Sequence, residues 1–325
     1  MNSQIEPTQV DVVIVGAGFS GMYMLYRLRQ LGLSVQVLEA GSDVGGTWYW
    51  NRYPGARCDV PSMEYSYSFS EELQQEWNWS EIMAAQPEIL EYANHVARRF
   101  DLRSDIQFDT RVASAIFAED SKRWDVSTQI GDHYSARFCI MATGCLSVPN
   151  TPVIAGAEDF SGPIYHTGNW PHEGVDFAGL SVGIIGTGSS GIQSIPVIAG
   201  QARHLTVFQR TPNYTMPAHN GPLSEAFQME AKSNYAEIRD EQRASQVGII
   251  GYGFGFGGAE SVEPTDEILA TTEAQRNALV EEEGFVAIRR FADVSVDPEA
   301  NELACEMYRQ QIKRVIKDNT TAESL

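Results

Sequence analysis

A glycine-rich turn near the N-terminus constrains the fold more than any other part of this sequence. The turn Gly16-Ala17-Gly18-Phe19-Ser20-Gly21 joins an apolar run at 10–15 to a stretch at 22–31 with apolar residues at helical spacing. This order predicts a strand, a tight turn and a helix. The first glycine permits the bend, the second lets the backbone approach a pyrophosphate, and the third lets helix and strand pack closely. The turn therefore predicts a dinucleotide site at the helix N-terminus.

A carboxylate follows this turn at the distance that a dinucleotide site requires. The short apolar run 34–38 predicts a second strand, and it ends on Glu39, 23 residues after Gly16. A carboxylate at this place is expected to hydrogen-bond a ribose hydroxyl. Because it would repel a 2′-phosphate, the first unit is predicted to bind FAD or NAD.

The same pattern recurs in the second half of the chain. The turn Gly186-Thr187-Gly188-Ser189-Ser190-Gly191 follows the apolar run 181–185 and precedes the helical stretch 192–199. The residue 23 positions after its first glycine is Gln209, and Arg210 follows it. Glutamine and arginine accept a 2′-phosphate, which predicts NADP for the second unit. The alternative is that Arg210 only caps a strand at the surface.

Composition and charge exclude several classes of protein. The chain has 325 residues, of which 43% are hydrophobic, and this is enough for two domains with their own cores. Its net charge of −20 disfavours nucleic acid and anionic membranes as partners. The four cysteines form no CxxC pair and have no metal-ligand spacing, so we expect reduced thiols and no metal site. With neither a signal peptide nor a membrane span expected, a cytoplasmic protein is predicted.

The rest of the chain divides into regions by pattern. Strands are predicted at 106–108, 112–117, 124–128, 137–141 and 205–208, and helices at 86–100, 224–246 and 298–317. We therefore predict an α/β fold of tandem Rossmann-like dinucleotide-binding units, FAD then NADP, with a helical insertion. The predicted regions are an FAD-binding domain at 1–150, the start of an NADP-binding domain at 151–215 and a helical region at 216–325.

The second unit is predicted to be incomplete. From residue 181 onward the pattern provides two strands before the helices begin, whereas a doubly wound nucleotide domain needs three or more parallel strands. We expect that the chain stops while this domain is still open, and that a complementary C-terminal chain could close it.

The segment between the two glycine-rich turns carries the most specific motif of the chain. Five residues stand at fixed places in the sequence FSGPIYHTGNWP, namely Phe160, Gly162, His166, Trp170 and Pro171. With the turns on either side, this segment resembles the F-x-G-x-x-x-H-x-x-x-W-[PD] fingerprint of the Baeyer-Villiger monooxygenases. The resemblance implies an FAD- and NADPH-dependent enzyme that converts ketones to esters or lactones with O2 through a C4a-peroxyflavin. Within that resemblance, Trp170 favours ketones over amines or sulfides.

The segment 45–59, dense in glycine and aromatic residues, also resembles the flavin segment of that family. The first turn and the resemblance together assign FAD contacts to Gly16, Gly18, Ser20, Gly21, Glu39, Thr47, Trp48, Asp59, Tyr65 and Val112. The second turn and the resemblance assign NADP contacts to Arg57, Cys58, Thr187, Gly188, Ser189, Ser190, Gly191, Ile192, Arg210 and Thr211. Asp59 and Arg57 form the predicted catalytic set, and His166 is expected to be a structural or hinge residue rather than a general base.

Two alternatives stay open. A flavin-containing monooxygenase that acts on nitrogen or sulfur has closely similar motifs, and an inactive FAD-binding fragment would need a complementary C-terminal half. In the Baeyer-Villiger family, Asp59 would pair with an arginine that lies beyond the helical region. We therefore expect that the 325-residue chain alone does not oxygenate a ketone.

Overall fold

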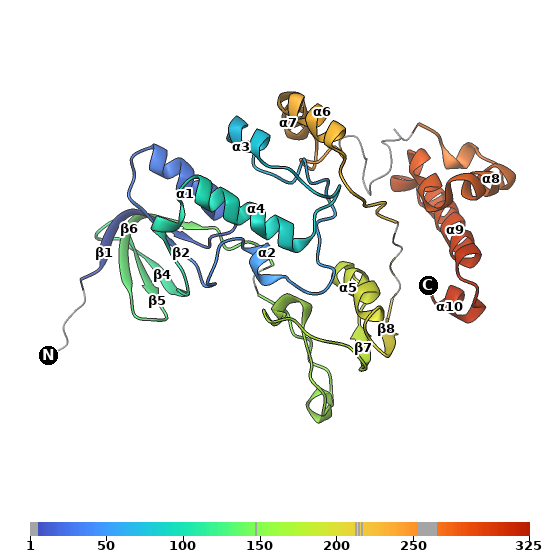
Figure 1. Ribbon diagram of the computed structural model, residues 1–325, viewed down its shortest axis with the longest axis horizontal. Coiled ribbons are helices and arrows are strands. Elements are labelled where there is room, and N and C mark those ends of the chain that lie inside the picture. The colour runs from blue at the N-terminus through green and yellow to red at the C-terminus, as the bar shows by residue number, and fades with distance from the viewer. Residues whose placement is uncertain (1–5, 147, 212, 214, 216, 252–264) are drawn as a thin grey trace. The chain divides into compact units, whose positions relative to one another are not determined.

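The computed structural model describes residues 6–146, 148–211, 213, 215, 217–251 and 265–325 (Figure 1). The chain forms two compact units, of which the first contains residues 1–56 and 85–176 and the second contains residues 57–84 and 177–325. Segment 57–84 thus belongs to the second unit, a placement that the sequence pattern did not indicate. The division by function into 1–150, 151–215 and 216–325 stays a prediction, because compactness does not test which residues bind which nucleotide.

The first unit contains a six-stranded sheet. Together with the helices between its strands, this sheet confirms the predicted α/β class. Its strands lie in the order β3-β2-β1-β6-β5-β4. β1 (Thr8–Val15), β2 (Val35–Leu38), β3 (Ile106–Gln107) and β6 (His133–Met141) are parallel, while β5 (Arg123–Thr128) is antiparallel to both β6 and β4 (Val112–Ala118). Val15 pairs with Leu38, so β1 and β2 end at the same edge of the sheet, where the first glycine turn and Glu39 follow them.

Two helices cover one face of this sheet (Figure 1). α1 (Phe19–Gln30) and α4 (Gln86–Arg99) each bury residues at helical spacing. The core between helices and strands includes Val12, Ile14, Met22, Leu25, Val37, Ala93 and Ala97. Because strand residues alternate between faces, a second cluster lies on the other face and includes Val13, Leu38, Val126, Tyr134 and Ala136. The short helices of this unit are α2 (Thr47–Trp50), η1 (Arg103–Asp105), η2 (Ala157–Asp159) and η3 (Thr167–Asn169).

The second unit repeats the first strand, turn and helix of the other unit. β7 (Ser181–Ile185) and β8 (His204–Phe208) form a parallel pair that α5 (Ser189–Ala199) connects. Within the described ranges, the sheet of this unit has two strands, as the pattern predicted. Apolar side chains on this pair lie in contact with solvent, since Ile185 is 73% exposed and Phe208 is 56% exposed.

The predicted helix at 224–246 is two helices. α6 (Glu225–Ser233) and α7 (Tyr235–Ala244) meet at Asn234, whose φ of −109° and ψ of 10° leave the helical region. Asparagine competes with helix hydrogen bonds through its own side chain, which favours a break at this position. The unit also contains α3 (Glu71–Glu76), which begins at Ser70, whose hydroxyl oxygen accepts from the N–H of Leu73.

Residues 265–325 form a cluster of helices with its own core. The elements are η4 (Ile268–Ala270), α8 (Glu273–Glu283), η5 (Gly284–Arg290), η6 (Asp293–Ser295), α9 (Pro298–Val315) and α10 (Asn319–Ser324). α8 begins with a capping box between Thr272 and Gln275, and α9 begins at the cap Asp297. The buried residues include Ile268, Val280, Phe291, Ala300 and Met307. None of the helices in the described part of the chain has the length and apolar character that a bilayer span requires.

A buried arginine binds segment 57–84 to α7. Arg239 is 6% exposed. Its guanidinium donates to the carbonyl oxygens of Met63 and Glu64 at 3.2 and 2.9 Å, to Ser66 Oγ at 2.7 Å and to Gln74 Oε1 at 3.1 Å. The ring of Tyr235 lies 5.0 Å from the guanidinium carbon and adds a cation–π contact. Loss of this side chain would leave several buried acceptors without a donor.

Arg239→Met is therefore expected to lower the free energy of unfolding of the second unit by about 3 kcal/mol or more. The matched control is Arg243→Met on the same helix, because Arg243 is exposed and pairs with exposed Asp240. We expect the control to change stability by less than about 0.5 kcal/mol. The measurement is the urea midpoint followed by tryptophan fluorescence. Equal midpoints for the two variants would contradict the proposed role of Arg239.

Candidate functional site

The first glycine turn has the backbone geometry that its sequence predicts. Gly16 has a φ of +104°, which favours glycine, and a Cβ on Gly21 would lie 2.0 Å from the carbonyl oxygen of Gly16. Gly18 is the N-cap of α1, and no side chain caps this helix end. The N–H groups of the first helical turn therefore have no side-chain acceptor at the cap, as an anion-binding helix N-terminus requires.

Glu39 is buried beside this turn, and it holds the turn in place. One carboxylate oxygen accepts from the N–H of Ala17 at 2.6 Å, and the other accepts from the N–H of Gly41 at 2.7 Å. The carbonyl of Glu39 accepts from the N–H of Thr110 at 2.8 Å. The predicted bond to a ribose stays a prediction. Each carboxylate oxygen has a second lone pair that could accept from a hydroxyl.

The segment after Glu39 returns to the first turn. The N–H of Gly45 donates to the carbonyl of Ala17 at 3.1 Å, and a Cβ on Gly46 would lie 2.8 Å from the Cα of Gly18. α2 starts here, with Thr47 exposed and Trp48 buried. The backbones thus meet without side chains between them, which fits a pyrophosphate that approaches the helix N-terminus.

The predicted FAD residues divide between the two units. Gly16, Gly18, Ser20, Gly21, Glu39, Thr47, Trp48 and Val112 belong to the first unit, whereas Asp59 and Tyr65 belong to the second. Ser20 is exposed in the first turn of α1. Val112 begins β4, two residues after Thr110, whose backbone contacts Glu39. The structure thus brings the first turn, Glu39, Thr47, Trp48 and the start of β4 together, and their contacts with FAD stay predictions.

The second glycine turn has nearly the same conformation as the first. Gly186 has a φ of +101°, and a Cβ on Gly191 would lie 2.4 Å from the carbonyl oxygen of Gly186. The N-cap of α5 is Gly188, with φ −70° and ψ 179°, compared with −74° and −172° at Gly18. Among the described residues, no side chain caps α5, and a Cβ on Gly188 would meet no atom within 4 Å. The described residues thus leave space beside this helix N-terminus, as a phosphate site requires.

Side chains around the second turn are predominantly polar. Thr187 Oγ1 donates to Gln209 Oε1 at 3.2 Å, so Gln209 contacts a side chain of the second turn, whereas Glu39 contacts the backbone of the first. Arg210 and Thr211 are exposed, and the guanidinium of Arg210 forms no ion pair with any residue in the described part of the chain. Ser189, Ser190 and Ile192 lie in the first turn of α5. These positions fit the predicted NADP site, which stays a prediction.

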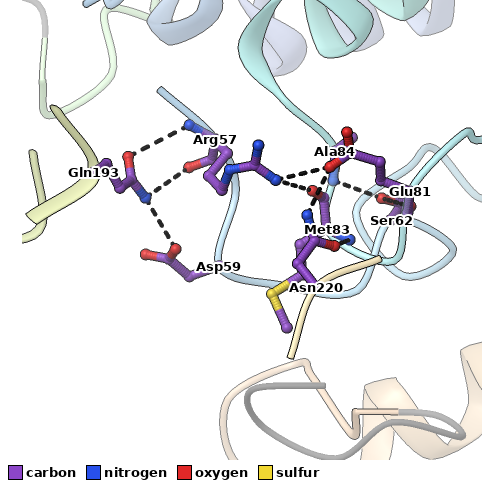
Figure 2. Close-up of polar contacts among 8 residues, drawn as sticks. All are labelled: Arg57, Asp59, Ser62, Glu81, Met83, Ala84, Gln193 and Asn220. Carbon is purple, nitrogen blue, oxygen red and sulfur yellow. Dashed lines mark hydrogen bonds and ion pairs between the residues drawn. The ribbon is translucent and has the colours of Figure 1, made fainter. Parts of the chain in front are cut away.

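Gln193 joins the second turn to the predicted catalytic residues, and sequence reasoning missed it (Figure 2). Its Nε2 donates to the carbonyl oxygen of Arg57 at 3.2 Å and to Asp59 Oδ1 at 3.0 Å, while its Oε1 accepts from the N–H of Arg57 at 3.4 Å. The sequence does contain a signal, because Gln193 is a long polar residue just before the apolar run at 195–199 of α5. Its partners lie more than 130 residues away, which local patterns do not show.

The guanidinium of Arg57 points away from Gln193 toward a second polar cluster (Figure 2). Arg57 Nη1 donates to Glu81 Oε2 at 2.8 Å and to the carbonyl of Met83 at 3.2 Å. Asn220 donates to the same Glu81 oxygen at 2.6 Å and accepts from the N–H of Met83 at 2.8 Å. Burial alone would raise the pKa of Glu81, but the hydrogen bonds from Arg57 and Asn220 outweigh it and lower that pKa. The pair is therefore ionised at neutral pH, and it weakens as the pH falls through that lowered pKa.

Cys58 lies between the two predicted catalytic residues, but its thiol is not activated. Its N–H donates to the carbonyl of Ala84 at 3.0 Å, and burial raises the pKa of its thiol to about 11. At neutral pH Cys58 is therefore a protonated, inert thiol. All four cysteines are free.

The fingerprint residues lie in the first unit and have structural contacts. Trp170 is buried with its ring 5.6 Å from that of Tyr165. His166 Nδ1 accepts from the N–H of Gly168 at 3.0 Å, which caps η3. This contact agrees with the expected structural role of His166, which stays a prediction. Phe160 is exposed, while Gly162 and Pro171 are half-buried.

Comparison with known proteins finds close relatives along the whole chain. The profile of the family described as pyridine nucleotide-disulphide oxidoreductase matches residues 13–285. A Baeyer-Villiger monooxygenase of Pseudooceanicola batsensis is 42% identical over 100% of this chain and 60% of its own length. Phenazine N-monooxygenase PhzNO1 of Lysobacter antibioticus is 39% identical over 98% of this chain and 58% of its own length.

Solved structures give the same result. Cyclohexanone monooxygenase from Rhodococcus sp. Phi1 bound to NADP+ has a TM-score of 0.87 and 40% identity over 98% of this chain and 59% of its own. Oxidized steroid monooxygenase bound to NADP has a TM-score of 0.83 and 52% identity over 98% of this chain and 60% of its own. The chain thus spans about 60% of the length of these relatives.

The open space at Gly188 generates a prediction about the second turn. Gly188→Ala should keep the thermal midpoint of the parent chain, because the added Cβ meets no atom of the described residues within 4 Å. It should weaken NADP+ binding by about tenfold, or about 1.4 kcal/mol, because the Cβ takes space that the pyrophosphate needs. Gly221→Ala, which also meets no atom within 4 Å, is the control outside the turn. Calorimetric titration decides, and unchanged affinity in Gly188→Ala would show that the turn is not the phosphate site.

Proposed function

The chain belongs to the pyridine nucleotide-disulphide oxidoreductase family and is homologous over its whole length to Baeyer-Villiger monooxygenases, and from this premise we propose its function. The first unit binds FAD, and the second unit binds NADPH. Together they serve the oxidation of a ketone to an ester or lactone by O2. The activity of a whole enzyme is part of this proposal, because the chain spans about 60% of the length of its relatives.

One observation carries the proposal. The chain contains two glycine turns of nearly equal backbone geometry that lead to chemically different partners, Glu39 beside the first and Gln209 with Arg210 beside the second. A carboxylate suits a ribose with free hydroxyls, whereas an exposed arginine suits a 2′-phosphate. Two dinucleotides of different kinds are therefore the ligands that this pair of turns fits best.

The chain's own residues bind and orient the nucleotides. FAD, when bound, supplies the transfer of electrons from NADPH to O2. Gly16, Gly18 and Glu39 hold its pyrophosphate and ribose, and Thr47 and Trp48 lie beside the same turn. In the second unit, the N–H groups of α5 bind the NADP pyrophosphate, and Arg57 has its Nε and Nη2 available for the nucleotide because Nη1 carries its bonds to Glu81 and Met83.

A further polypeptide is proposed to complete the active enzyme. The two-stranded sheet of the second unit exposes Ile185, Val207 and Phe208, and a third parallel strand with a covering helix would bury such side chains. That polypeptide would also supply the arginine partner of Asp59. We place the protein in the cytoplasm, because its four cysteines are free, as a reducing compartment keeps them.

N- or S-oxygenation is the second candidate function. PhzNO1, named as an N-monooxygenase, is nearly as similar to this chain as the first Baeyer-Villiger relative. Both reactions use the same nucleotide sites. The substrate therefore separates them.

The activity test uses the FAD-loaded chain alone and the chain joined to the remaining part of the Pseudooceanicola batsensis relative. Each protein receives NADPH, O2 and either cyclohexanone or a tertiary amine, and gas chromatography measures lactone and N-oxide. We expect lactone from the joined protein and no product from the chain alone. Lactone from the chain alone would disprove the need for a further polypeptide, and N-oxide without lactone would favour the second candidate.

Arg210 is expected to determine the choice of coenzyme. Arg210→Ala should weaken NADPH binding by about 1.5 to 3 kcal/mol, because a charge-assisted hydrogen bond to the 2′-phosphate is lost. NADH binding should change little, since NADH has no such phosphate. Arg203→Ala, next to the start of β8, is a control for loss of positive charge. Equal losses for NADPH and NADH in Arg210→Ala would contradict the assignment.

A further inference from the structure

The amide of Gln193 uses both of its functions on a segment far away in the chain (Figure 2). The Oε1 atom accepts from the N–H of Arg57, and the Nε2 atom donates to the carbonyl of the same residue. The second proton of Nε2 then points to Asp59 Oδ1 at 3.0 Å. One side chain thus fixes the backbone at Arg57 and the direction of the carboxylate at Asp59.

Only a primary amide can make this set of contacts from this position. The arrangement needs one acceptor and two donors, which glutamine has and glutamate lacks. Asparagine has the same groups on a side chain that is shorter by one methylene. An apolar side chain of similar size would leave the carbonyl of Arg57 and the carboxylate of Asp59 without this donor.

Arg57 is held from its other side as well. Its guanidinium bonds Glu81 and the carbonyl of Met83, and Asn220 bonds both Glu81 and the N–H of Met83. The backbone and the side chain of Arg57 are therefore held by different residues. Gln193 holds the backbone from α5, where it lies two residues after the last glycine of the second turn.

We propose that Gln193 is a positioning residue that holds Arg57 and Asp59 on the helix of the second glycine turn, so that this segment and the turn form one preformed nucleotide site. The inference rests on the proposed binding of NADP at that turn. A segment that is already ordered loses less conformational entropy when the nucleotide binds, which raises affinity. By linkage, bound nucleotide stabilises the 57–59 segment to the same extent.

The test compares the FAD-loaded parent chain with Gln193→Leu, Gln193→Glu and the control Gln201→Leu. Gln201 is exposed just beyond the end of α5. Gln201→Leu therefore makes the same change of side chain as Gln193→Leu, but at a residue that forms no hydrogen bond with residues 57–59 in the described part of the chain. Three quantities are measured for each protein: the dissociation constant of NADP+, hydrogen–deuterium exchange in the peptide that covers 57–60, and the bound FAD.

Gln193→Leu is expected to weaken NADP+ binding by about tenfold or more, since the three hydrogen bonds to Arg57 and Asp59 are lost. Exchange in the 57–60 peptide should become faster, and FAD content should stay that of the parent.

In Gln193→Glu the new carboxylate faces that of Asp59, with Arg57 and Glu81 as the other charged groups nearby. Two adjacent carboxylates do not ionise independently. The affinity of Gln193→Glu relative to the parent should therefore fall as the pH rises from 5 to 8, whereas that of Gln193→Leu should stay constant.

Two results would overturn the inference. If the parent binds NADP+ and Gln193→Leu binds it with equal affinity, Gln193 does not position the site. If Gln193→Leu and Gln193→Glu both bind NADP+ more weakly than the parent by the same factor at every pH, Gln193 only stabilises the structure of α5. A parent chain that does not bind NADP+ contradicts the proposed function itself, and this outcome is recognised before any variant is measured.

Discussion

The close approach of backbone to backbone at the two glycine turns is the constraint on which the rest of the structure depends. A Cβ on Gly21 or Gly191 would lie 2.0 or 2.4 Å from the carbonyl oxygen of the first glycine of its own turn, a distance that no side chain tolerates. Each turn therefore fixes the angle at which a helix leaves its strand and directs uncapped N–H groups toward one point. The close packing of each helix on its strand and the anion-binding geometry of its N-terminus both follow from these contacts.

The two turns differ in the residues around them, and the proposed function rests on this difference. Buried Glu39 bonds the backbone of the first turn, whereas Gln209 bonds the side chain of Thr187 in the second and leaves exposed Arg210 beside it. Segment 57–84 belongs with the second turn, where Gln193, Asn220 and Arg239 bond its backbone. Asp59 and Tyr65, which are predicted to contact FAD, thus belong to the unit that is proposed to bind NADP.

Much of this could be predicted from the sequence, because the signals were local. Strands, glycine turns and α1, α4 and α5 are encoded by residues within a few positions of one another, and their predicted bounds agree with the structure to within about four residues. The break at Asn234 was missed because helical spacing continues across it. Gln193, Asn220 and Arg239 were missed for another reason, since each bonds backbone groups more than 130 residues away and no periodicity marks such contacts. The contacts of the predicted site residues with nucleotides stay predictions.

The central claim is that this chain has two separate dinucleotide sites of different specificity. Native mass spectrometry of the purified chain with FAD and NADP+ together tests it most directly, because the masses of the complexes count each nucleotide. We expect a ternary complex with one FAD and one NADP+ per chain, and no displacement of FAD by excess NADP+. A chain that carries only one nucleotide at a time, or that loses FAD as NADP+ is added, would contradict it.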